Sequence, residues 1–154
     1  MKVIGIDPGL VATGYGIIED GKCVSAGTIR SKEEKGHAKI LDICTRIKQL
    51  LDDNKPDIAV LEKVFYHKNV QSLIKSSELR GAIILTLLKN KMPLTEYAAT
   101  KIKLTTTGNG RASKEQVRYF IGKILMNNND RISNHATDAL AIAYTATCKM
   151  KDRI

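Results

Sequence analysis

Several features that would assign this protein to a particular class are absent or scarce in its sequence. The three cysteines, Cys23, Cys44 and Cys148, are widely spaced and include no Cys-x-x-Cys pair. This spacing argues against a disulfide framework or a zinc site and favours buried, reduced thiols. No apolar run approaches the roughly 18 residues that would suggest a bilayer span, and the first residues lack the charged and then apolar segments of a signal peptide. We therefore expect a cytoplasmic protein that does not contact membranes.

Internal repeats, low-complexity segments and interdomain linkers are also missing, so we expect residues 1–154 to form a single domain. Apolar periodicity and turn signals predict strands at residues 2–7, 13–19, 23–30, 58–61 and 94–97. They predict helices from a capping box at Ser31 to Asn54, at 70–90, briefly after 97, from a second capping box at Ser113 to 126, and at 133–150. A basic, glycine-broken loop is expected at 105–111. This order describes an α/β fold in which a mixed five-stranded sheet carries helices on both faces.

Positive charge is concentrated in the middle of the chain. Residues 63–123 hold 12 Lys or Arg against 3 acids, whereas residues 1–62 hold 9 against 10 and residues 124–154 hold 4 against 3. The middle segment therefore carries the whole net charge of +9. A local surplus of this kind favours a polyanionic partner, and nucleic acid is the first candidate.

Two acidic residues stand at the ends of strands that are expected to be neighbours. Asp7 ends the first apolar strand, directly before Pro8-Gly9, and Glu62 ends the strand at 58–61. Taken alone, an aspartate before a tight turn commonly bonds its own backbone. Because parallel neighbours bring their carboxyl ends to one sheet edge, the two side chains are nevertheless expected about one strand spacing apart, roughly 5 Å.

The last helix begins with His135 and Asp138, which share one helix face at a spacing of three residues. Each alone is adequately explained by its place near the helix N-terminus. Together with Asp7 and Glu62 they form an oxygen-rich set suited to Mg²⁺ or Mn²⁺. A pair of such ions can activate water and stabilise the leaving oxygen in phosphodiester cleavage. The four residues therefore predict a metal-dependent site that acts on nucleic acid.

The sequence resembles the RuvC family of Holliday-junction resolvases along nearly its whole length. The matching segments are "GIDPGLVATGYGII", "LEKVFYHKN", "SSELRGA", "EYAATKIK", "TGNGRASKEQV" and "HATDALAIA", in the family's order and spacing. The resemblance implies a ribonuclease H-like, or retroviral integrase, fold. It implies a metal-dependent endonuclease that resolves four-way DNA junctions by paired symmetric nicks during homologous recombination and DNA repair.

The family's acidic residues correspond to Asp7, Glu62 and Asp138, which the resemblance implies to be the catalytic metal ligands. His135 stands where many members have a fourth aspartate and others a histidine, so it is expected to assist one metal. The implied cofactor is Mg²⁺, with Mn²⁺ as a substitute and two ions in each active site.

Further correspondences concern DNA binding. Phe65 matches an aromatic residue that wedges near the junction point, although a structural anchor for its loop is an equally good reading. Lys103 and Lys114 match lysines that contact phosphates. Arg111 and Lys114 also bracket the start of a helix after a glycine loop, where backbone N–H groups and positive side chains could together hold a phosphate.

The resemblance also implies partners. These are four-way junction DNA, a second copy of the chain, and the branch-migration complex of RuvA and RuvB. The small residues Ser76, Ser77, Gly81 and Ala82 either contact the second copy or pack their helix on its own sheet.

Three alternatives remain at this stage. Another ribonuclease H-like nuclease and a non-catalytic junction-binding module would share the fold. An actin-like sugar kinase would share the opening strand, the Asp-x-Gly turn and the Thr-Gly hairpin, but it needs a second lobe for which the chain is too short.

Overall fold

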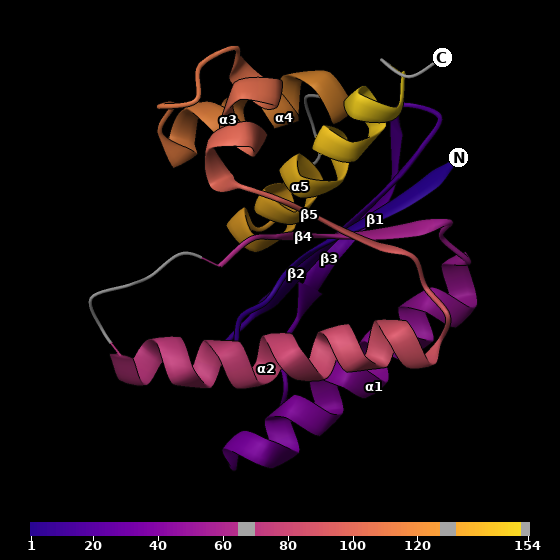
Figure 1. Ribbon diagram of the computed structural model, residues 1–154, viewed down its shortest axis with the longest axis vertical. Coiled ribbons are helices and arrows are strands. Elements are labelled where there is room, and N and C mark those ends of the chain that lie inside the picture. Colours follow the sequence, from indigo (N-terminus) through magenta and orange to yellow (C-terminus); the bar gives the residue numbers. More distant parts are fainter. Residues whose placement is uncertain (65–69, 127–131, 152–154) are drawn as a thin grey trace.

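The computed structural model describes residues 1–64, 70–126 and 132–151, and it places a central sheet between two groups of helices (Figure 1). Phe65, a predicted DNA contact, lies outside these residues. The elements are β1 (Lys2–Asp7), β2 (Thr13–Glu19), β3 (Lys22–Ile29), α1 (Gly36–Asn54), β4 (Ile58–Glu62), α2 (Val70–Lys89), β5 (Leu94–Tyr97), α3 (Ala99–Thr107), α4 (Lys114–Leu125) and α5 (Asn134–Lys151).

The sheet has the order β3-β2-β1-β4-β5 and is mixed, as predicted. β1, β2 and β3 form an antiparallel meander, and the β2–β3 turn places Asp20 and Gly21 at positive φ of 51° and 82°. This is the turn geometry that suits the right-handed twist of a hairpin. β4 runs parallel to β1, with Ile6 beside Leu61, and β5 runs parallel to β4. The register therefore brings Asp7 and Glu62 to the same edge.

Each face of the sheet has its own apolar core. Successive side chains of a strand point to opposite faces, so Ile4 of β1 packs with α1 and α2 while Val3 packs with α3, α4 and α5. α1 and α2 lie on one side of the sheet in Figure 1, and α3, α4 and α5 lie on the other. The predicted helices on both faces are thus confirmed.

Two local predictions need correction. The helix expected to begin at Ser31 begins at Gly36, and the Ser31 hydroxyl accepts from the Glu33 N–H without capping the helix. Thr105 to Thr107, expected in a loop, are the last turn of α3, which ends where Gly108 adopts φ 77°. Gly108 ends the helix because a left-handed C-terminal residue costs glycine little. The capping box at Ser113 and Gln116 is confirmed.

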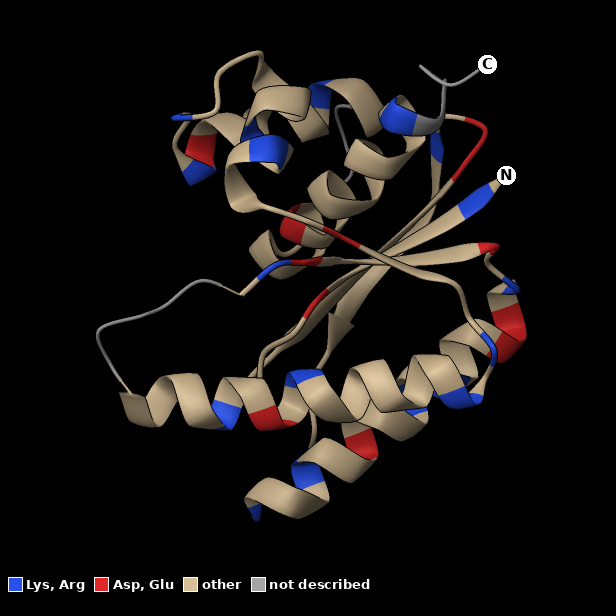
Figure 2. Ribbon diagram, in the orientation of Figure 1, with Lys and Arg blue, Asp and Glu red and all other residues tan. Residues whose placement is uncertain are grey.

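The positive middle segment does not form one surface. Figure 2 shows its Lys and Arg residues both on α2 and on α3 and α4, which lie on opposite sides of the sheet. On α2, Arg80 forms an ion pair with Glu96 of β5, which neutralises its charge. Near the ends of β1 and β4, basic residues come from α3 and α4, from Lys63 directly after β4 and from Lys75 of α2. None of the described helices is long and apolar enough to cross a membrane.

Candidate active site

Strand alternation directs the two strand-end acids to the face covered by α5. Val3 and Gly5 of β1 lie against α5 on that face. Side chains two residues apart in a strand point the same way, so Asp7 also points to this face. Val60 of β4 does likewise, and Glu62 follows it. Because β1 and β4 are parallel and in register, both carboxylates reach one edge beneath α5.

Two glycines let α5 lie directly on the sheet. A Cβ atom built on Gly5 would lie 2.2 Å from the carbonyl oxygen of Ala139, and one built on Gly14 would lie 2.0 Å from that of His135. Both contacts are with helix backbone, so no side chain could be accommodated without moving α5. This close approach carries His135 and Asp138 to the strand edge that holds Asp7.

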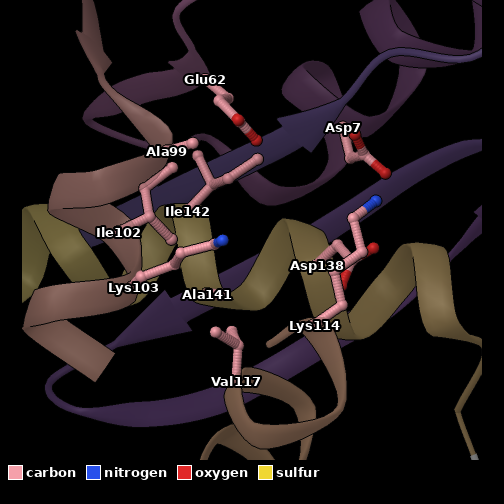
Figure 3. Close-up of a pocket in the computed structure, with 10 residues that line it drawn as sticks. All are labelled: Asp7, Glu62, Ala99, Ile102, Lys103, Lys114, Val117, Asp138, Ala141 and Ile142. Atoms are coloured by element: carbon pink, nitrogen blue, oxygen red, sulfur yellow. The ribbon is translucent and has the colours of Figure 1, made fainter. Parts of the chain in front are cut away.

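A pocket of about 200 Å³ opens at this edge. Asp7, Glu62 and Asp138 all line it, as do Lys103 of α3 and Lys114 at the start of α4. Figure 3 shows the Lys114 ammonium group directed towards Asp7. The other residues that line the pocket are apolar: Ala99, Ile102, Val117, Ala141 and Ile142. The three acids and both predicted DNA-binding lysines therefore line one pocket.

The two strand-end carboxylates have perturbed proton affinities. Burial is the main cause that raises the pKa of Asp7, and the negative charge of Asp138 raises it further, while a hydrogen bond and the charge of His135 oppose the shift. Burial also raises the pKa of Glu62, and the Asp7 charge adds to the effect. Lys114 lowers both pKa values without cancelling the shifts. The raised pKa values of Asp7 and Glu62 thus come mainly from burial, and repulsion among the neighbouring acids adds to them.

His135 approaches Asp7 from outside that pocket. Its Nδ1 atom lies 3.5 Å from Oδ2 of Asp7, and the side chain lines a neighbouring hollow together with Gly9 and Ser76. The imidazole is 45% exposed, so it remains accessible from solvent. His135 is therefore adjacent to the acids but on the far side of Asp7.

Asp138 has a partner that sequence reasoning missed. Arg118 of α4 donates to both carboxylate oxygens, with Nε 3.0 Å from Oδ1 and Nη2 2.9 Å from Oδ2. The one available signal was helical spacing, because Arg118 lies four residues after Lys114 and so shares its face. That spacing could indicate a second basic residue near the pocket, but it could not name the partner.

The other predicted DNA contact, Arg111, does not line the pocket. It lies in the exposed turn between α3 and α4, and its N–H donates to the Asn109 side chain. The N–H groups of Ala112, Ser113 and Gln116 also donate within this segment. A phosphate bound here would therefore depend on side chains more than on these backbone groups.

The donor atoms of these residues are of the chemical type that a hard divalent cation prefers. The set offers carboxylate oxygens and one imidazole nitrogen, and burial together with mutual repulsion raises the pKa of two of the carboxyl groups. Across the three described stretches of chain, however, no three His, Cys, Asp or Glu side chains converge closely enough to hold a metal ion. The candidate ligands are gathered at one edge, and Asp138 is engaged by Arg118.

Comparison with known proteins gives this arrangement a family. The family model described as RuvC, crossover junction endodeoxyribonuclease, matches residues 3–146. The chain belongs to the RuvC family. Members of this family are metal-dependent nucleases, which agrees with the donor chemistry of the pocket.

Curated RuvC relatives match over most of their length. A crossover junction endodeoxyribonuclease RuvC of Chlorobium phaeovibrioides is 38% identical over 149 residues, which are 93% of this chain and 79% of the relative. One of Carboxydothermus hydrogenoformans is 35% identical and covers 97% of this chain and 98% of its own.

Solved structures extend the RuvC likeness to three dimensions. Thermus thermophilus RuvC in complex with a Holliday junction substrate superposes with a TM-score of 0.89 at 25% identity, covering 99% of this chain and 96% of that one. The yeast mitochondrial Holliday junction resolvase Ydc2, at 15% identity and a TM-score of 0.67, shares the fold. The ribonuclease H-like fold expected from the RuvC resemblance is confirmed.

Proposed function

We propose that this protein is a metal-dependent, structure-specific endonuclease that resolves four-way DNA junctions. It does so by paired symmetric nicks in opposed strands, in homologous recombination and DNA repair. The observation that carries this proposal is the pocket in which Asp7, Glu62 and Asp138 lie together with Lys103 and Lys114. Acids that gather cations stand beside lysines that attract phosphate, as cleavage of a phosphodiester requires.

In this proposal Asp7, Glu62 and Asp138 hold two Mg²⁺ ions, which Mn²⁺ can replace, and His135 assists at one of them. When bound, such ions lower the pKa of water and neutralise charge on the leaving oxygen. The Asp7 charge raises the pKa of Glu62, and its Oδ2 lies 3.5 Å from Nδ1 of His135, so Asp7 is the acid best suited to contact both ions. Lys103 and Lys114 offset the charge that develops on the scissile phosphate. Arg111 extends the DNA contact beyond the pocket, and Phe65 is assigned to the junction point by the RuvC resemblance.

The domain organisation, partners and location that we propose are those implied by the RuvC family. Residues 1–154 form one nuclease domain, since one sheet carries both apolar cores. The partners are junction DNA, a second copy of the chain and the branch-migration complex of RuvA and RuvB, and the location is the cytoplasm. Both copies of a symmetric dimer would present the same pocket, one to each opposed strand.

Cleavage of a labelled four-way junction tests the proposal directly. With Mg²⁺, the wild-type protein should nick opposed strands of the junction and leave a linear duplex of the same sequence intact. Asp7→Asn keeps the side-chain shape but removes its charge, so it should abolish nicking and retain junction binding. Asp53→Asn removes a carboxylate from the exposed end of α1 and should nick like the wild type.

The same assay separates the alternatives. Equal cleavage of linear duplex would assign the chain to another kind of ribonuclease H-like nuclease. Tight junction binding with no cleavage in Mg²⁺ or Mn²⁺ would make it a non-catalytic module. If Asp7→Asn lost binding together with cleavage, the assignment of Asp7 as a metal ligand would be wrong.

A further inference from the structure

The contact between Arg118 and Asp138 is unusual for a residue expected to bind a cation. Arg118 and Asp138 lie 20 residues apart in sequence, on two helices that pack together. The guanidinium group engages both carboxylate oxygens in parallel, and the two side chains are only 25% and 21% exposed. Paired, bidentate bonds of this kind are stronger and more specific than ordinary surface ion pairs.

We propose that Arg118 is a built-in counter-ion that competes with divalent cations for Asp138. In the cation-free protein it holds both oxygens of this carboxylate, so a cation that binds Asp138 has to displace the guanidinium group or bind against the repulsion of its charge. The inference rests on the proposed function, because it takes Asp138 to be a metal ligand. It goes beyond that function by assigning to a residue of α4 the control of cation affinity.

Competition follows from the chemistry of the two groups. A guanidinium has donors but no acceptor, so it cannot join a cation's ligand shell and can only repel the cation. A divalent ion that approaches Asp138 therefore gains one carboxylate, but it meets a fixed positive charge within contact distance of the same oxygens. Removing that charge should strengthen cation binding even though it removes a hydrogen-bonding partner of Asp138.

The alternative role, that Arg118 orients Asp138 for the cation, predicts the opposite. An orienting residue improves cation binding, so its loss should weaken binding. Arg118 holds its positive charge against both oxygens, whereas an orienting partner bonded to one oxygen would leave the other further from its charge. The geometry therefore favours competition.

The test is Mn²⁺ binding to the DNA-free protein, followed by electron paramagnetic resonance of the free ion. Arg118→Gln, which keeps a hydrogen-bond donor without the charge, should bind Mn²⁺ on the order of fivefold more tightly than the wild type. Arg118→Lys keeps the charge but loses the bidentate fork, so its affinity should be intermediate. The matched control is Arg46→Gln on α1, because Arg46 also pairs with an aspartate, Asp42, with Nε 3.0 Å from Oδ1. It removes the same charge far from the pocket and should bind Mn²⁺ like the wild type.

Each result decides the matter. Unchanged or weaker Mn²⁺ binding by Arg118→Gln overturns the inference, and an equal gain in Arg46→Gln would reduce it to an effect of net charge. Asp138→Asn, made in the wild type and in the Arg118→Gln background, tests the metal role separately. If it weakens binding while Arg118→Gln brings no gain, only the inference about Arg118 fails. If it changes binding in neither background, the metal role of Asp138 in the proposed function fails as well.

Discussion

At the scale of single residues, the pocket holds carboxylates whose ionised form lowers the stability of the folded protein. Burial raises the pKa of Asp7 above its usual 3.8, and the charge of Asp138 raises it further. The folded chain therefore holds this proton more tightly than the unfolded chain does. Asp7 favours folding below about pH 4 and ceases to do so as the pH rises through its raised pKa, so its ionised form opposes folding at neutral pH.

The destabilising effect of ionised Asp7 at neutral pH can be tested by a stability measurement. In EDTA at pH 7, Asp7→Asn should melt at a higher temperature than the wild type, by on the order of 2–4 °C. The difference should shrink as the pH falls and should vanish well below the usual aspartate pKa of 3.8, where Asp7 is protonated in both the folded and the unfolded chain. Thermal unfolding followed by circular dichroism, with Asp53→Asn as the control, measures both effects. A lower melting temperature for Asp7→Asn at pH 7 would show that the carboxylate stabilises the fold.

His135 gives a second prediction at this scale, since its Nδ1 lies within 3.5 Å of Asp7. If it binds a cation, His135→Ala should lose most cleavage at limiting Mg²⁺, whereas His135→Asp should stay active. Nitrogen is a softer ligand than oxygen, so the aspartate variant should also prefer Mn²⁺ over Mg²⁺ less strongly than the wild type. Cleavage rates across a titration of each cation provide the measurement. A His135→Ala protein that matches the wild type throughout would leave His135 as a residue of the first helical turn.

At the scale of elements, the site depends on how closely α5 lies on β1 and β2. Gly14→Ala would place a methyl group about 2.0 Å from the His135 carbonyl oxygen, so α5 has to move. Because α5 carries two of the four proposed ligands, cleavage and Mn²⁺ affinity should both fall, together with thermal stability. Gly122→Ala in α4 is the matched control, since its new Cβ would meet nothing within 4 Å. That change should leave cleavage intact and raise stability slightly. Normal Mn²⁺ affinity in Gly14→Ala would contradict the role given to the close approach.

The helices α3 and α4 form the positive side of the pocket through Lys103 and Lys114. If both lysines contact phosphates, Lys103→Ala and Lys114→Ala should each weaken junction binding on any sequence. Each should also reduce the logarithmic salt slope by about 0.9. Lys48→Ala on α1, where Lys48 pairs with Asp52, should change neither quantity. Binding isotherms from 50 to 200 mM salt measure the slopes, and an unchanged slope for either pocket variant would remove that lysine from the contact.

At the scale of the whole molecule, α2 presents an apolar stripe to solvent. Val70, Ile74, Leu85 and Leu88 are each more than half exposed, and Ser77 and Gly81 lie between them on the same helical face. Packing on the sheet is carried instead by Leu79, Ile83 and Leu87. The small exposed residues are therefore not explained by packing on the protein's own sheet, and the stripe suits a second copy of the chain.

Sedimentation equilibrium tests that interface. The wild type should be a dimer at micromolar concentration, and Leu85→Lys should shift it towards monomer because a charge would be buried between the two helices. Leu41→Lys alters a comparably exposed leucine on α1 and should leave the dimer unchanged. If the dimer is needed for paired nicks, Leu85→Lys should also release singly nicked junctions. A dimer that survives Leu85→Lys would place the interface elsewhere.

The sequence alone determined most of the fold and the proposed acids, because these depend on short-range rules. Strand alternation, helical period and turn residues act over a few positions, so β1, β4 and the carboxylates at their ends could be read from the chain. Errors occurred where local signals compete, as at the start of α1. Tertiary structure alone decided the partnership of Arg118 with Asp138 and the division of the basic segment between two faces of the sheet. Both depend on how α4 packs beside α5 and how α2 crosses to the opposite face, and such contacts are set by the shapes of distant surfaces that no local period encodes.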